Sequence, residues 1–370
     1  MRVKIMREAL LRPLQHAAAV IDRRPQQQHP IYGNLKLAAS EGELRLVGND
    51  GEAEMRARVD AEVIEEGETT ASGAKLVEIV RSCPAETIIE FVVEEGRLRI
   101  RAGRGSYRLS TLPAADFPSI DEFQGELAIA VEAGVLRSAL ERTAFAMAQN
   151  DVRYFLNGLL FDVEGQRLRC VATEGHRLAL AERALAETVG RSRQFIVPRK
   201  AVLEIQRILA ELEDEEVLRL EVGPNLLRLQ VKGLCFTSKL IDARYPDYQA
   251  VIPINAERTA LIGRAAFREV LQRVAILAHE KLRGVRLEFG DGSVRVSADN
   301  PEREEAVEEL DAEGNARGIA VGFNVHYLLD AIGAVSGERV VLRMRDAYSS
   351  ALLQGEGDES DRHVIMPLRL

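Results

Sequence analysis

The chain has 370 residues, with 58 acidic side chains against 49 lysines and arginines, and a net charge of −9. A chain of this length is too long to fold around one hydrophobic core of ordinary size. It suits three units of about 120 residues, which is near the usual size of a domain. The acidic balance argues against a generic nucleic-acid binder, which is normally basic.

Nothing in the composition indicates export or a membrane span. The amino terminus has no apolar core of signal-peptide length, and no stretch reaches the ~18 apolar residues of a spanning helix. The three cysteines, Cys83, Cys170 and Cys235, are odd in number and show no CxxC spacing, which fits a reducing compartment. We therefore expect a cytoplasmic protein, free in solution, with no membrane partner.

A strand followed by a helix recurs three times, about 125 residues apart, and such repetition determines the whole fold. The strands are predicted at residues 3–5, 127–130 and 259–262, and the helices at residues 7–18, 132–144 and 263–275. These helices align without gaps, so that apolar residues share positions: Leu10 with Leu136 and Phe267, and Leu14 with Leu140 and Leu271.

A second helix also recurs, predicted at residues 73–83, 198–209 and 323–335, with Val77, Leu203 and Leu329 in register. Runs that alternate polar and apolar residues lie between the helices and predict antiparallel strands. They include residues 43–47, 87–92, 97–101, 159–163, 167–171, 218–222, 227–231, 285–289, 294–297 and 340–344. The turn Asp291-Gly292 is a strong hairpin signal.

Each repeat therefore contains two similar halves, and each half is one helix with a few antiparallel strands. This pattern predicts an α+β fold of three repeated domains. Proline-containing stretches close the first two repeats, and we predict domains at residues 1–124, 125–254 and 255–370.

The residues offer no catalytic or metal-binding constellation. None of the six histidines stands in an HxxxH or HExxH arrangement, and no GxxxxGK[ST], GxGxxG or GxSxG motif occurs. The acidic runs at residues 211–216 and 302–309 read as solvated faces or interaction surfaces. We expect no metal, no cofactor and no enzymatic activity.

Basic residues occur along the repeated helices, including Arg7, Arg137, Arg199, Lys200 and Arg268. If the helices face one side, an acidic protein can still present a basic inner surface to phosphates. Ordinary solvated helix faces are the alternative interpretation of the same charges.

Several segments resemble one protein family. They are Asn-Asp-Val-Arg-Tyr-Phe-Leu-Asn-Gly at residues 150–158, Ala-Thr-Glu-Gly-His-Arg-Leu at 172–178, Val-Pro-Arg-Lys at 197–200, Asp-Ala-Arg-Tyr-Pro-Asp-Tyr at 242–248, Glu-Lys-Leu-Arg-Gly-Val-Arg at 280–286 and Met-Pro-Leu-Arg-Leu at 366–370. Together they resemble the bacterial DNA polymerase III beta subunit, the sliding clamp, across all three repeats in order.

The resemblance implies a DNA-clamp fold and a head-to-tail homodimer whose six domains form a ring around double-stranded DNA. It implies a non-catalytic processivity factor of DNA replication. The implied partners are the replicative polymerase alpha subunit, the clamp loader and other clamp-motif peptides, with repair proteins among them. The implied location is the cytoplasm, in association with the nucleoid.

The resemblance also assigns residues to three sites. A partner-peptide pocket would use Leu156, Thr173, Gly175, His176, Arg177, Leu178, Pro246, Val251, Tyr348, Ser350, Val364, Ile365, Met366, Pro367, Leu368 and Arg369. DNA would contact Arg24, Asn150, Arg153, Tyr154, Arg199 and Lys200. The dimer seam would use Tyr107, Leu109, Ile276, Leu277, Glu304 and Glu305.

Two pocket positions depart from the commonest family pattern. Ala250 stands where an arginine is frequent, and Tyr348 stands where a smaller aliphatic residue is frequent. Two other functions remain open: an enzyme that binds a phosphorylated metabolite between two lobes, and a peptide-binding scaffold that does not encircle DNA. A threefold repeat without a catalytic motif disfavours the first, and retention on circular DNA would distinguish the second.

Overall fold

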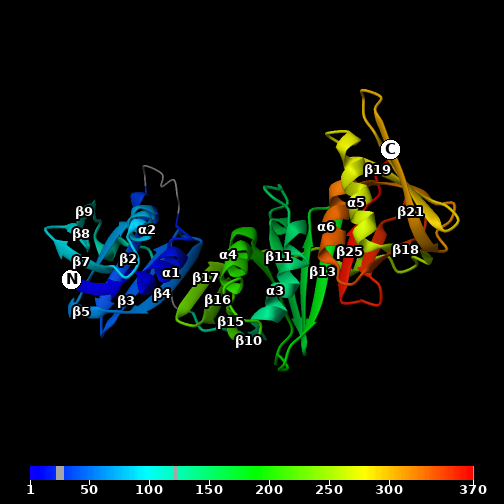
Figure 1. Cartoon of the computed structure of the whole chain (residues 1–370). Helices are drawn as coiled ribbons and strands as arrows, with labels where there is room; N and C mark the ends of the chain where they lie inside the picture. The colour runs from blue at the N-terminus through cyan, green and yellow to red at the C-terminus, as the bar shows by residue number, and fades with distance from the viewer. Residues whose placement is uncertain (22–28, 121–122, 370) are drawn as a thin grey trace. The chain divides into compact units, whose positions relative to one another are not determined.

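The computed structural model describes residues 1–21, 29–120 and 123–369 (Figure 1). The predicted DNA contact Arg24 lies outside these residues. The described helices are α1 (Arg7–Ala17), α2 (Gly73–Ser82), α3 (Ala133–Glu141), α4 (Arg199–Leu209), α5 (Arg264–Val274) and α6 (Val325–Ala334). They confirm both sets of repeated helices. None of these helices is long and apolar enough to cross a membrane.

The aligned apolar positions of the first repeated helix form its buried face. Leu10, Leu136 and Phe267 are fully buried, and so are Leu14, Leu140 and Leu271. The spacing of four residues places each pair on one side of its helix, where it packs against the sheets.

In the second repeated helix, the residues that fell into register are not the core residues. Leu203 is 40% exposed, while its neighbour Val202 is fully buried. Leu76 and Leu328, the residues before Val77 and Leu329, are likewise fully buried. The core face of this helix is therefore centred one residue before the positions that align in register.

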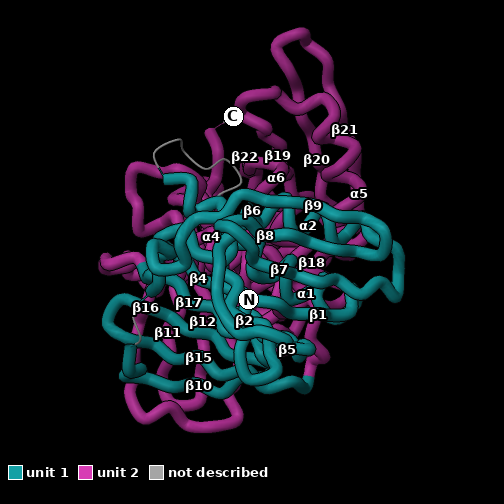
Figure 2. Tube along the Cα trace, turned by 90° about the vertical axis from the view of Figure 1, so that its left-hand side faces the viewer, with its two compact units in different colours: residues 1–132, 215–240 teal, residues 133–214, 241–370 magenta. Residues whose placement is uncertain are grey.

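Contacts divide the chain into two compact units (Figure 2). The first unit joins Met1–Glu132 to Glu215–Leu240. It contains a five-stranded sheet in the order β5-β1-β7-β8-β9 and an eight-stranded sheet in the order β10-β15-β16-β17-β4-β3-β2-β6. The strands are β1 (Arg2–Met6), β2 (Asn34–Ser40), β3 (Glu43–Asn49), β4 (Ala53–Asp60), β5 (Glu62–Glu65), β6 (Gly67–Ser72), β7 (Ile88–Glu94), β8 (Arg97–Ala102), β9 (Gly105–Ser110), β10 (Leu127–Glu132), β15 (Val217–Val222), β16 (Leu226–Val231) and β17 (Leu234–Lys239).

The second unit joins Ala133–Asp214 to Ile241–Leu370, and a single twelve-stranded sheet runs through its described part. The strand order is β14-β11-β12-β13-β25-β24-β23-β18-β21-β20-β19-β22. These strands are β11 (Gly158–Glu164), β12 (Arg167–Thr173), β13 (Arg177–Ala184), β14 (Arg193–Pro198), β18 (Arg258–Gly263), β19 (Gly284–Phe289), β20 (Ser293–Asp299), β21 (Glu305–Gly314), β22 (Ala320–Asn324), β23 (Arg339–Met344), β24 (Ala351–Gly355) and β25 (Asp361–Ile365).

Every strand run predicted from alternation overlaps a strand of the structure. The predicted hairpin is also present, since β19 and β20 pair antiparallel around a turn whose Gly292 has φ of +77°. That left-handed conformation suits glycine, which has no Cβ to clash. The α+β fold of antiparallel sheets with six α-helices in the described residues is therefore confirmed.

The compact units do not coincide with the repeats because the sheets continue past the ends of the repeats. In the first unit, β17 pairs with β4, so strands of the first and second predicted domains share one sheet. In the second unit, β13 pairs with β25, which joins strands of the second and third predicted domains. The boundaries near residues 124 and 254 rest on the sequence repeat and remain a prediction.

Candidate functional site

Strands β13 and β25 bring the two main groups of predicted pocket residues together. Leu178 lies opposite Val364 in the antiparallel register, and Arg177 lies opposite Ile365. Beyond the last paired residues, the Met366 amide donates a hydrogen bond to the His176 carbonyl at 2.9 Å. Residues nearly 190 positions apart are therefore direct neighbours.

An apolar cluster lies on one face of these strands. Leu156, Leu178 and Val364 are 2%, 3% and 1% exposed, and they pack in one cluster with Tyr245 and Leu352. Alternation along a strand sends every second side chain to the same face, which is why Leu178 and Val364 share it. The predicted Pro246 and Val251 are exposed on the segment whose Tyr245 is buried in this cluster.

The carboxy-terminal segment lines a neighbouring pocket of about 610 Å³. Predicted residues in its wall are Tyr348, Ser350, Met366, Pro367, Leu368 and Arg369. The Leu368 amide donates a hydrogen bond to the Gly322 carbonyl at 2.8 Å, which fixes the segment beside β22. Tyr348 is 85% exposed, so its ring is available to cover a bound molecule. Sequence reasoning did not name the lining residues Arg286 and Gly322.

The loop before β13 has a defined conformation that requires glycine. The Thr173 hydroxyl donates to the Arg177 carbonyl at 2.6 Å and accepts from the Gly175 amide at 3.1 Å. Gly175 has φ of +101°, and a Cβ at this position would lie 2.9 Å from Nη1 of Arg153. A larger residue would therefore strain the backbone and displace the arginine.

The Arg177 side chain makes its contacts away from the apolar cluster. Its Nη1 donates to Oδ2 of Asp330 at 2.5 Å, and its guanidinium lies 4.5 Å from the ring centroid of Tyr327. Burial, together with a hydrogen bond to Glu174, raises the pKa of Tyr327 to about 12. Arg177 thus ties β13 to α6, on the strand face opposite Leu178.

Ile365 is likewise not brought to the face that carries Val364. It is 1% exposed and packs in a different cluster, with Leu353 and Ala351. The reason is the alternation of side chains along β25, which sends adjacent residues to opposite faces.

The predicted DNA contacts that fall within the described residues lie close together. The Arg199 amide donates to the Asn157 carbonyl at 3.0 Å, which joins the start of α4 to the loop that carries Asn150, Arg153 and Tyr154. Lys200 is exposed one residue later. Hydrogen bonds from the side chain and the backbone amide of Arg153 lower the pKa of Asp151 to about 2. Arg153 also donates to the Glu174 carbonyl at 3.0 Å, next to the pocket loop.

The predicted seam residues lie on two strands with an unpaired edge and on a short helix end. Tyr107, 39% exposed, and the half-buried Leu109 are on β9, the last strand of the five-stranded sheet. Ile276 is 77% exposed and Leu277 is half-buried. The exposed Glu304 directly precedes β21, and the exposed Glu305 is the first residue of that strand. Strand β21 pairs with β18 only from Ala312 onward.

No group of three or more histidine, cysteine, aspartate or glutamate side chains within the described residues could hold a metal ion. The arrangement that the structure does offer is an apolar floor, a neighbouring pocket and a polar loop. Such a surface can bind the side chains of a peptide and hydrogen-bond its backbone.

Family models of the DNA polymerase III beta subunit match the chain along most of its length. The N-terminal domain model matches residues 1–121, the central domain model residues 130–247 and the C-terminal domain model residues 249–369.

Relatives and solved structures agree with these matches. The beta sliding clamps of Pseudomonas putida and Escherichia coli K12 are 43% and 40% identical, each aligned over all of both chains. A crystal structure of the clamp from Pseudomonas aeruginosa, bound to griselimycin, superimposes with a TM-score of 0.96 at 42% identity, with full coverage of both chains. The polymerase III beta subunit of Caulobacter crescentus gives 0.94 at 34% identity, again with full coverage of both. The chain therefore belongs to the family of bacterial DNA polymerase III beta subunits, the beta sliding clamps.

Proposed function

We propose that two copies of this chain associate head to tail and form a closed ring around duplex DNA. The ring tethers the replicative polymerase alpha subunit and serves as a docking platform for the clamp loader and repair proteins. The observation that carries this proposal is the match of all three clamp-domain models, in order, across the chain. Family membership makes the chain a processivity factor of DNA replication and not a catalytic subunit. The ring would act in the cytoplasm, on the nucleoid.

The size of the repeats supports a dimer. A domain of about 120 residues approximates a sphere about 35 Å across. Three such spheres in a triangle leave a gap of only about 5 Å, whereas six in a hexagon leave a hole roughly 35 Å wide, enough for a duplex of about 20 Å. Head-to-tail contacts that close generate a ring. We take the domains as residues 1–124, 125–254 and 255–370.

Complementary charge supports the assignment of the seam. The free edge of β21 carries Glu305, Glu308, Glu309 and Asp311, while Arg108 is exposed on β9 and Arg104 precedes it. Two unpaired strand edges can complete each other's hydrogen bonds. Opposite charges across the contact would align them, and the apolar pair Ile276 and Leu277 would add buried area.

The pocket residues support peptide docking. A short segment of a partner could place apolar anchors over Leu178 and Val364 and beside Met366 and Pro367. Griselimycin binds the clamp of Pseudomonas aeruginosa. We infer that this surface of the present chain binds a short peptide segment of its partners.

Retention on DNA of two topologies tests the function. Clamps loaded on nicked circular duplex should remain bound when salt is raised and should leave when the circle is linearised. Binding to linear duplex should be weak and should fall steeply with salt, because only phosphate contacts hold it. Equal salt sensitivity on both templates would refute encirclement and favour a peptide-binding scaffold.

A further inference from the structure

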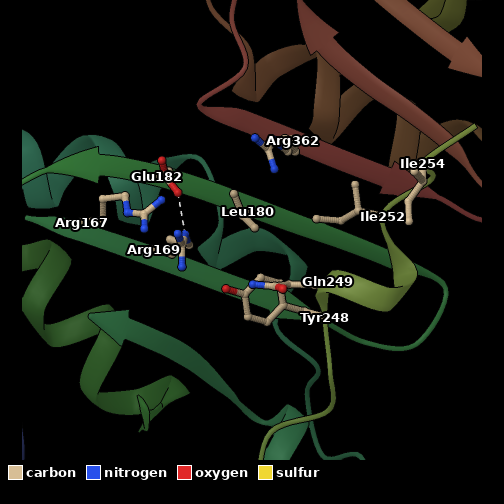
Figure 3. Close-up of a pocket in the computed structure, with 9 residues that line it drawn as sticks. All are labelled: Arg167, Arg169, Leu180, Glu182, Tyr248, Gln249, Ile252, Ile254 and Arg362. Carbon is tan, nitrogen blue, oxygen red and sulfur yellow. Dashed lines mark hydrogen bonds and ion pairs between the residues drawn. The ribbon is translucent and has the colours of Figure 1, made fainter. Parts of the chain in front are cut away.

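A groove of about 350 Å³ lies on the second unit, lined mainly by residues that no predicted site includes (Figure 3). Its lining comprises Arg167, Arg169, Leu180, Glu182, Tyr248, Gln249, Ile252, Ile254 and Arg362. Arginines come from β12 and β25, and the apolar wall comes from β13 and the segment around η5 (Gln249–Val251).

This groove continues the apolar floor of the peptide pocket. Leu178 pairs with Val364 in the pocket floor, and two residues further along β13, Leu180 pairs with Arg362 in the groove. Two residues of a strand span about 7 Å, so the groove begins about one such step from the floor. Leu180 and Leu178 also belong to the same buried apolar cluster, so no polar barrier separates the two places.

The charge of the groove is positive. Its lining has three arginines and one glutamate, and Asp162 and Glu164 beside the lining pair with Arg169 and Arg167, so Arg362 carries the positive charge that has no carboxylate partner within the described residues. Arg169 is already neutralised, because its Nε donates to Glu182 at 2.5 Å and its Nη1 lies 3.6 Å from Asp162. Although burial opposes it, the hydrogen bond to Glu182 raises the pKa of Arg169.

Arg362 and Arg167 are the arginines that can take an added carboxylate. Arg362 donates its Nε to the Glu359 carbonyl at 3.0 Å and, within the described residues, forms no ion pair with a carboxylate. Arg167 pairs with Glu164 at 3.2 Å, but both side chains are more than half exposed. Such exposed pairs are weak and exchange easily.

Apolar side chains border these arginines. Ile254 is 89% exposed, and Ile252 is partly buried against the cluster beneath the groove. Figure 3 shows Arg362 reaching from β25 on one side, with Ile252 and Ile254 beside it. The phosphate backbone of a nucleic acid would make no favourable contact with the apolar wall. A peptide can place an acidic side chain against the arginines and an apolar side chain against the wall.

We propose that this groove is a second subsite for the same partner peptide, one that accepts a glutamate or aspartate flanking the apolar anchors. The proposal rests on peptide docking at the pocket. In extended conformation the acidic side chain lies about two or three residues beyond the anchor over Leu178 and Val364. Partners with an acidic flank then occupy the clamp in preference to partners that share only the anchors.

The test uses dye-labelled clamp-motif peptides and fluorescence anisotropy with the full dimer. The core peptide carries the anchors alone, and four longer peptides add two glutamates or two glutamines to its amino or carboxyl end. A glutamate pair at one end should tighten binding roughly three- to tenfold over the matched glutamine pair, and added salt should remove the gain.

The clamp variant Arg362→Gln should remove this gain while it leaves affinity for the core peptide unchanged. Arg317→Gln removes an arginine of the same unit that is 72% exposed and forms an ion pair with the exposed Asp291, and it should leave the gain intact. Arg362→Glu should reverse the preference, so that a lysine-flanked peptide binds more tightly than a glutamate-flanked one.

The outcomes separate this inference from the proposed function. Equal binding of glutamate- and glutamine-flanked peptides, or equal losses for core and flanked peptides in Arg362→Gln, would overturn the second subsite alone. A core peptide that does not bind the wild-type clamp would overturn peptide docking and the subsite with it.

Discussion

Arg183 and Asp361 form a two-point ion pair between the neighbouring strands β13 and β25. Nη1 of Arg183 lies 2.7 Å from Oδ1 of Asp361, and Nη2 lies 3.2 Å from Oδ2. The Asp361 side chain is 3% exposed, and Arg142, just after α3, places its Nε 3.6 Å from the same carboxylate. The pair therefore joins the strands that carry the pocket residues Leu178 and Val364.

Replacing Asp361 with alanine should destabilise the second unit by about 3–5 kcal/mol, because it removes the buried carboxylate and leaves the half-buried guanidinium groups of Arg183 and Arg142 without their partner. Urea unfolding of the purified protein measures the loss. Asp291→Ala is the matched control, since Asp291 is 86% exposed and pairs with the exposed Arg317. It should change the free energy of unfolding by less than about 1 kcal/mol. Similar losses for both variants would contradict a structural role for the buried pair.

His363 should make the protein sensitive to acid. Burial, with a smaller effect from Arg142, lowers the pKa of His363 to about 3 from 6.5, and neither ring nitrogen has a hydrogen-bond partner among the described residues. The unfolded chain therefore takes up a proton below pH 6.5 while the folded protein does not. Stability is complete above this pH and falls as the pH decreases, by about 1.4 kcal/mol per pH unit.

The variant His363→Leu isolates this effect from the titration of carboxylates. Between pH 6.5 and about 5, wild type should lose roughly 2 kcal/mol more than the variant, because only the wild type has the proton linkage at this position. Denaturant midpoints at several pH values give the difference. Parallel pH profiles for the two proteins would show that His363 is protonated freely in the folded state.

The double variant Ile276→Ala, Leu277→Ala should run as a folded monomer near 41.0 kDa in sedimentation experiments. Burial of these side chains at each seam would contribute about 2–5 kcal/mol per large residue, which truncation removes. Within one chain Ile276 is 77% exposed, so its loss should leave the fold intact. Val217→Ala, at a position 61% exposed on β15, is the control and should remain dimeric. Persistence of the dimer at nanomolar concentration would refute the seam assignment.

Deletion of residues 367–370 should abolish stimulation of the polymerase without affecting dimerisation or retention on circular DNA. The deletion removes Pro367, Leu368 and Arg369 from the wall of the pocket and breaks the hydrogen bond from Leu368 to Gly322. Primer extension on a long template measures processivity. A truncated clamp that still supports processive synthesis, or that falls apart into monomers, would disprove the pocket assignment.

Arg153→Ala should weaken binding to linear duplex without opening the ring, and the structure adds a second effect. Arg153 lies against Gly175 and donates to the Glu174 carbonyl, so its loss should also loosen the loop beside the pocket. We expect the affinity for linear duplex to depend less steeply on salt concentration. We also expect a modest loss of affinity for the peptide. Arg317→Ala, far more exposed and outside both sites, should change neither quantity.

Sequence patterns predicted those helices and strands that bury one face and expose the other. The helix positions of Leu10, Leu136 and Phe267 were readable because each packs fully into a core, and alternation marked strands such as β12 and β16. Strand β21 was not among the predicted strands, because glutamates occupy many of its positions and none of its first seven residues is buried. Its pairing with β20 creates the strand in spite of that composition.

The sequence predicted which segments form the candidate site, but it did not predict which side chains of those segments face the pocket. The motif at residues 172–178 includes both Leu178 and Arg177, yet adjacent strand residues face opposite ways. Only the structure separates the pocket floor from the bridge that Arg177 makes to Asp330. The groove at Arg362 left no signal in the sequence, because its lining residues converge from three segments distant in the chain.

The free edges of β9 and β21 have a consequence for how newly made chains meet. An open strand edge pairs with any other open edge, including its own copy. Two β21 edges would bring rows of glutamates together, and two β9 edges would bring Arg108 of each copy together. Like charges directly opposite each other destabilise a strand pair. Contacts between identical edges are therefore disfavoured, so two copies in the proposed ring would pair β9 of one with β21 of the other.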